Sequence, residues 1–116
     1  MAESAHVVLK AVAFRLLGHL DLYEDRMTVL VDDPNVSNLV EVSALMDVMR
    51  AEAASIPQLT GLWVSFLISH TEIVRTLVIG SRPEASVFDQ LEPHTALLLD
   101  LESRCLEIAT GRRGPL

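Results

Sequence analysis

The chain has 116 residues, enough for a single domain spanning 1–116 with one small core. Its formal net charge is -7, which argues against binding to nucleic acid or to an anionic membrane surface. Half of the residues are apolar and the mean hydropathy is +0.36, so a domain this small should leave some apolar surface to face a partner chain.

Apolar residues recur at spacings of three and four throughout the chain, which predicts helices rather than strands. The first helix is expected from Ser4 to Val31, with Gly18 inside it at a cost of about 1 kcal/mol relative to alanine. Asp33 should cap the second helix, with Pro34 in that helix's first turn. The apolar stripe of the first helix is Ala5, Leu9, Val12, Leu16, Leu20, Tyr23, Met27 and Leu30.

The second helix is expected from Pro34 to Ala54, and Pro57 stops it because the residue before a proline avoids the helical region. Two sides of this helix are apolar, which suggests that it buries more than one face. Its main stripe is Leu39, Val42, Met46, Met49, Ala53 and Ile56, and its second side is Val36, Val40, Ala44, Val48 and Ala51.

The third helix is expected from Gln58 to Ile79, with Gly80 as its C-cap. It is long and apolar enough to cross a bilayer, but charged groups near its middle are costly in lipid, so we interpret it as a buried helix and expect no membrane span. Its stripe is Leu59, Trp63, Phe66, His70, Ile73 and Leu77. Its opposite side carries small residues that allow a second helix to come close, namely Gly61, Ser65 and Ser69.

The fourth helix is expected to begin with a capping box from Ser81 to Glu84 and to end at Thr110-Gly111. Pro93 lies inside it and should kink or split it. Its stripe is Val87, Leu91, His94, Leu98, Leu101, Cys105 and Ile108. Short connections between long helices favour antiparallel neighbours, so the predicted fold is an all-α, up-down-up-down four-helix bundle.

Three histidines are expected at one height of this bundle. His70 lies twelve residues before Arg82, the centre of the last turn (82 - 70 = 12), and His94 lies twelve after it (94 - 82 = 12). His19 borders the first stripe within about one turn of the same height. Three imidazoles could hold a divalent transition metal such as zinc. A buried polar layer that fixes helix register is the alternative, and we favour it.

No motif with a specific catalytic spacing is present, so an enzymatic role is not expected, nor is a cofactor. The single cysteine, Cys105, excludes an internal disulfide, and the N-terminus does not resemble a signal peptide, so we expect a cytoplasmic protein. The favoured hypothesis is a non-enzymatic interaction module that forms a homodimer or binds a partner helix. The alternative is a bundle that binds a metal or a small apolar ligand at the histidine layer. The candidate contact residues are Val40, Ala44, Val48, Gly61, Ser65 and Ser69.

Overall fold

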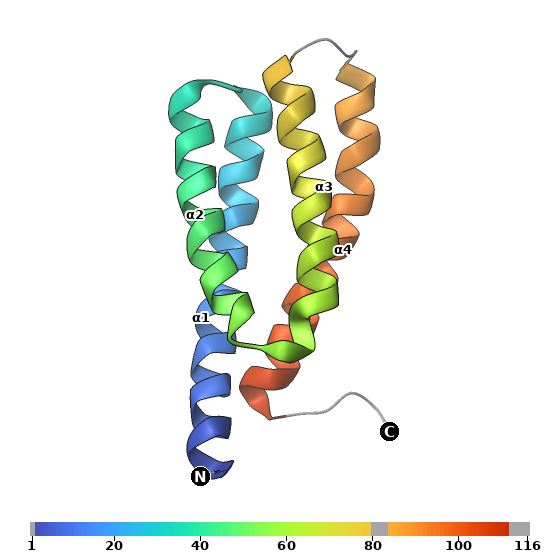
Figure 1. Ribbon diagram of the computed structural model, residues 1–116. Coiled ribbons are helices and arrows are strands. Elements are labelled where there is room, and N and C mark those ends of the chain that lie inside the picture. The colour runs from blue at the N-terminus through green and yellow to red at the C-terminus, as the bar shows by residue number, and fades with distance from the viewer. Residues whose placement is uncertain (1, 80–83, 112–116) are drawn as a thin grey trace.

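The computed structural model describes residues 2–79 and 84–111, with side chains described for 7–79 and 87–111. Four α-helices pack together, and these residues contain no strand (Figure 1). The helices are α1 (Ala2–Asp32), α2 (Val36–Ala54), α3 (Thr60–Ile79) and α4 (Glu84–Thr110), and a short 3-10 helix, η1 (Pro57–Leu59), precedes α3. The fold is therefore all-α, as the helical spacing of apolar residues predicts.

The four predicted stripes form the core. In the described part of the chain, each stripe residue is either buried or partly buried against the core. Ala5 lies outside the described side chains. The largest fully buried side chains come from all four helices and η1, and they include Tyr23, Leu16, Leu20, Met49, Leu59, Phe66, Ile73 and Leu101. Burying apolar surface of this kind is the main favourable term in folding, so the stripes account for why the helices assemble.

The start of α2 differs from the prediction. Asn35, not Asp33, is the N-cap, and its side-chain oxygen accepts a hydrogen bond of 2.8 Å from the backbone N–H of Asn38. Asp33 is unsuited to capping because its own backbone N–H continues the α1 hydrogen-bond pattern, donating to the Val29 carbonyl at 2.9 Å. The helix consequently begins at Val36, and Pro34 lies in the connection rather than in the first turn.

Residues close to Pro57 determine how α2 ends and α3 begins. Ile56 is extended, as expected for a residue before proline. Pro57 then opens a 3-10 turn instead of the predicted α-helix, and the Thr60 hydroxyl donates to the Pro57 carbonyl at 3.0 Å. Gly111 ends α4 with a φ of 73°, which is the left-handed C-terminal position that glycine favours. The predicted Gly80 cap and the capping box from Ser81 to Glu84 lie outside the described residues.

Two residues that could have interrupted helices do not do so. α1 runs through Gly18 without a break, and α4 is one continuous helix through Pro93, so it is not split there. The segment Pro57–Ile79 is long and apolar enough to cross a membrane, with a mean hydropathy of 1.4. A core helix passes the same test of length and composition, and Phe66 and Ile73 of this segment are fully buried in the bundle.

Candidate functional site

The centre of the bundle contains a hydrogen-bonded chain of four side chains. The Tyr23 hydroxyl on α1 lies 2.8 Å from Nδ1 of His70 on α3 and 2.7 Å from Nε2 of His94 on α4. The second ring nitrogen of His94, Nδ1, lies 2.8 Å from the Ser69 hydroxyl on α3. We call Ser69, His94, Tyr23 and His70 the polar chain. It joins three of the four helices.

The protons of the polar chain can be arranged in two ways. In one, Nδ1 of His70 donates to Tyr23, Tyr23 donates to Nε2 of His94, and Nδ1 of His94 donates to Ser69. In the other, every one of these donations is reversed, beginning at the Ser69 hydroxyl. Each neutral imidazole carries one N–H and the hydroxyls both donate and accept, so either arrangement satisfies every bond of the chain.

Burial keeps the polar chain uncharged. Desolvation, with a smaller contribution from the neighbouring His94, lowers the pKa of His70 from 6.5 to about 4. Desolvation also lowers the pKa of His94 from 6.5 to about 4. The pKa of Tyr23 is raised, because burial penalises the phenolate. The three groups are therefore neutral at neutral pH, and none of them is a strong base or nucleophile there.

Aromatic rings surround the polar chain. Phe66 stacks on the His94 ring, with centroids 4.9 Å apart and an angle of 18° between the planes. Phe66 also meets Tyr23 edge to face at 5.0 Å, and Trp63 lies 5.5 Å from Phe66. These ring contacts pack the polar chain against the aromatic side chains of α3. The arrangement is consequently suited to holding helices in register.

The structure brings two of the three predicted histidines together. The His70 and His94 rings have centroids 6.4 Å apart, and both point into the core. His19 instead points toward α2, where its Nδ1 lies 2.7 Å from Oε1 of Glu52, and its side chain is 34% exposed. The reason is its position, since it lies beside the α1 stripe and not in it. The three imidazoles therefore do not form one group of metal ligands.

The residue that links the two imidazoles, Tyr23, was not predicted as part of the site. The sequence analysis treated Tyr23 only as a core residue, because it lies in the apolar stripe of the first helix. Its hydroxyl could have indicated a polar contact there. A tyrosine that is buried in a helix stripe needs a hydrogen-bond partner for its hydroxyl. The two inward histidines at the same height are the available partners.

A different set of side chains has metal-ligand spacing. The carboxylates of Asp21 and Glu24 on α1 and Glu102 on α4 have oxygen atoms within 4.8 Å of one another. Burial raises the pKa of Glu102, and the charges of Glu24 and Asp21 raise it further. We call these three residues the acidic cluster, and they place negative charge at the seam between α1 and α4.

A groove lies along the same seam. Its volume is about 680 Å³, and it is partly open to solvent. Tyr23 and His94 line it, as do Glu24 from the acidic cluster and Leu77 of α3. Its walls are largely apolar and come from α1 and α4, including Met27, Val31, Val87, Phe88, Leu91 and Leu98. We call this the α1–α4 groove.

The predicted contact residues occupy two separate seams. Val40, Ala44 and Val48 are exposed on α2, in a row of four-residue spacing that continues to Glu52, which binds His19 of α1. This row therefore borders the α1–α2 seam. The α3 row consists of Gly61 and Ser65, which are exposed, and Ser69, which binds His94. It borders the α3–α4 seam, so the two rows do not form one surface.

No protein-family model, curated protein or solved structure matches the chain. The geometry described above consequently carries the functional argument.

Proposed function

We propose that this protein is a non-enzymatic helical module that self-associates through the outer face of its α1–α2 hairpin. The observation that carries the proposal is an exposed apolar surface on both helices of that hairpin. From α2 it includes the row Val40, Ala44 and Val48. Exposed apolar side chains that neighbour one another on a small domain are typical of an interaction site, which supports the proposal.

Two side chains of α1 extend this surface. Leu22 and Val29 are exposed. Each lies three residues after a side chain of α1 that pairs with α2. Those groups are His19, which binds Glu52, and Arg26, whose Nη1 lies 3.1 Å from Oε2 of Glu41. Because residues three apart are neighbours on a helix, Leu22 and Val29 border the same seam as the α2 row. We call Leu22, Val29, Val40, Ala44 and Val48 the outer face.

Gly18 supports close packing of another helix on this face. It is exposed in the middle of α1, and a methyl group added at its Cα would meet no atom of the chain within 4 Å. Nothing in the folded chain therefore requires glycine there, although glycine weakens a helix by about 1 kcal/mol relative to alanine. A second backbone approaching α1 at this position would require it.

A second copy of the chain is the occupant that we propose. A two-fold axis would place the same apolar face on both partners, so that each covers the other and the contact closes. We also propose a cytoplasmic location. Cys105 is the chain's single cysteine and its thiol is buried, and the described residues contain no disulfide, which supports this location.

Light scattering after size-exclusion chromatography, from micromolar to near-millimolar concentration, tests self-association. We expect the native chain to be a dimer and Val48→Glu to be a monomer, because the new charge would be buried in the contact. Val64→Glu is the matched control, since Val64 on α3 is 47% exposed and Val48 is 46% exposed. A native chain that remains monomeric over the whole range, or two variants that behave alike, would overturn the proposal.

We also infer an up-down-up-down order of the helices, with a bend of α4 near Pro93. The connection between α1 and α2 is only residues 33–35, which favours antiparallel neighbours. Pro93 has no N–H for the Asp89 carbonyl, and its ring crowds that carbonyl, which supports a bend. Residual dipolar couplings should give different axes for residues 84–92 and 94–110. A single axis would contradict the bend.

A further inference from the structure

The α1–α4 groove has the size and lining of a small-molecule site. Its volume of about 680 Å³ lies within the range of roughly 300–1,000 Å³ that is typical of ligand pockets. Met27, Val87 and Leu98 form buried parts of its wall, and Leu77 of α3 also lines it. The groove lies on α1 and α4, whereas the outer face lies on α1 and α2, so the two features are independent.

The inner end of the groove requires no polar group from a ligand. Tyr23 and His94 line it, and their hydroxyl and ring nitrogens are already paired within the polar chain. Both groups are neutral at neutral pH, so neither repels a cation. Tyr23 is fully buried and His94 is nearly so, so they form the inner wall of the groove and offer little surface of their own. Phe88, which also lines the groove, is 63% exposed and supplies an aromatic ring that a bound molecule can reach.

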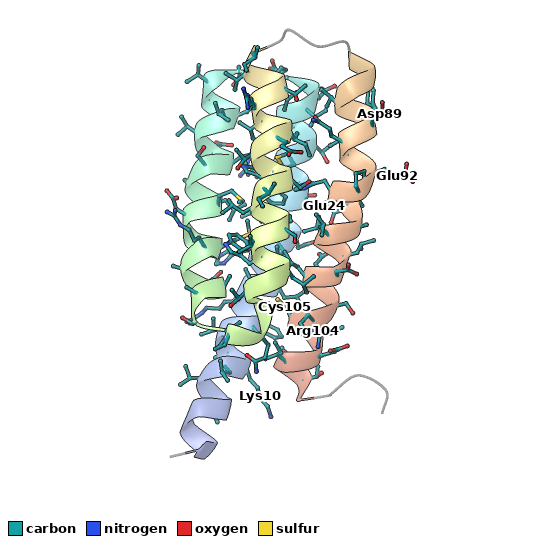
Figure 2. The ribbon with its side chains drawn as sticks, turned by 45° about the vertical axis from the view of Figure 1, so that its right-hand side comes forward. Lys10, Glu24, Asp89, Glu92, Arg104 and Cys105 are labelled. Atoms are coloured by element: carbon teal, nitrogen blue, oxygen red, sulfur yellow. The ribbon has the colours of Figure 1, made fainter. Side chains whose placement is uncertain are left out.

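The charges on the groove are all negative. Glu24 and Asp32 line it, and no Lys or Arg does so in the part of the chain that the structure describes. Neither carboxylate takes part in an ion pair with another described residue. In Figure 2, Glu24 lies between α1 and α4 near the middle of the bundle, whereas Lys10 and Arg104 lie lower, nearer the end that holds the start of α1. Glu24 therefore carries its charge beside an apolar groove without a neutralising partner among these residues.

The acidic cluster strengthens the preference for positive charge. Glu24 shares the cluster with Asp21 and Glu102, and their oxygen atoms lie within 4.8 Å of one another. Three neighbouring carboxylates repel one another, and a cation nearby relieves that repulsion. An aromatic face attracts cations as well, and Phe88 supplies an exposed one. Apolar walls, an exposed aromatic ring and an unneutralised acidic edge together define the chemistry of the ligand.

We propose that the α1–α4 groove binds a small lipophilic cation. The apolar body of the ligand packs between Met27, Val87 and Leu98, and its positive charge lies toward Glu24. An anion of the same size meets the same walls but is repelled at the acidic edge. A metal ion is a poor occupant, because most of the lining is apolar.

Isothermal titration calorimetry with two ions of matched shape tests the charge preference. Tetraphenylphosphonium should bind, and tetraphenylborate should bind at least about tenfold more weakly or not at all. Equal binding of the two ions would show an apolar site without the proposed preference and would overturn the proposal, as would binding of neither ion. Binding of a basic amphipathic peptide in place of tetraphenylphosphonium would make the groove a protein-docking site and would also overturn it.

Three variants locate the binding. Glu24→Gln should weaken tetraphenylphosphonium roughly fivefold or more, whereas Glu72→Gln, at an exposed carboxylate on α3, should not change it. Thr95→Trp places a bulky ring at an exposed position of the groove and should abolish binding by filling it. Tetraphenylphosphonium affinity that is the same in Glu24→Gln and Thr95→Trp as in the native chain would place the ion elsewhere and overturn the assignment. Repeating the titration in Val48→Glu separates this result from self-association.

Discussion

At the scale of single residues, the Tyr23 hydroxyl is the central contact of the bundle. It pairs with ring nitrogens of both His70 and His94, and no other described side chain joins α1 to both α3 and α4 by hydrogen bonds. A buried polar group without a partner is costly, so the effect of removing the hydroxyl should exceed the modest net value of a hydrogen bond. The polar chain therefore contributes to which helix register is stable.

Tyr23→Phe should lower the free energy of unfolding by about 1–3 kcal/mol, because it leaves nitrogens of His70 and His94 unpaired in the core. Urea denaturation measures this change. Adding His70→Leu to Tyr23→Phe removes one of the unpaired groups, so the double variant should lose less stability than the two single variants together. Simple additivity would contradict the view that the residues act as one chain.

Acid should destabilise the fold through the same two histidines. Their pKa is about 4 in the folded chain and 6.5 in the unfolded chain. Between these pH values the unfolded chain therefore binds more protons than the folded one. The stability of the neutral pair is fully present above about pH 6.5 and is lost as the pH falls toward 4. His70→Leu should flatten this decline in urea titrations from pH 7.5 to 4.5 relative to the native chain. Parallel curves for the two proteins would contradict it.

The raised pKa of Glu102 acts in the opposite direction, because protonating a repelled, partly buried carboxyl favours the folded state. This contribution is common to the native chain and to His70→Leu. The comparison of the two proteins therefore isolates the histidines.

At the scale of the helices, the apolar stripes were predicted well and the helix starts were not. A stripe is repeated over several turns, so one misread residue does not alter it. The start of α2 depends on a single cap, and Asn35 rather than Asp33 supplies it because the backbone of Asp33 still belongs to the last turn of α1. Caps depend on such local hydrogen bonds, which periodicity does not reveal.

Gly18→Ala distinguishes the contribution of α1 to the stability of the monomer from its contribution to association. If Gly18 matters only for association, the variant monomer should be more stable by about 0.5–1 kcal/mol, since alanine is the better helix former and meets open space. Its dimer should be weaker, because the methyl group keeps the second helix away. Gly61→Ala is the control, as its added methyl also meets open space and it lies on α3. Equal dimer affinity in the native chain and Gly18→Ala would argue against close packing at Gly18.

At the scale of the whole molecule, the bundle is elongated, with principal extents of 52 × 30 × 19 Å. The start of α1 and the end of α4 lie at the same end of the molecule (Figure 1). The α1–α4 groove lies toward the other end, among residues from the second half of α1 and the first half of α4.

Cys105 provides a probe of global unfolding. Its thiol is fully buried on α4, and burial raises its pKa to about 12, with Glu102 and Glu52 contributing in the same direction. The thiolate is the reactive form, so Ellman's reagent at pH 8 should react slowly with the folded chain and at once in urea. Release of one thiol per chain at the unfolding rate would agree with this expectation. Rapid reaction of the folded chain would contradict it.

The sequence by itself determined the fold class, the core and the inward direction of His70 and His94, because a helical period of 3.6 residues assigns each side chain to a face. It also placed these two histidines at one height, since a short hairpin relates their positions. The tertiary structure decided the rest. Whether His19 meets His94 or Glu52, whether Tyr23 joins two imidazoles, and whether Glu24 borders a groove all depend on how each helix is rotated and spaced against its neighbours. Those angles and distances follow from the packing of all four helices together, and no single stripe contains them.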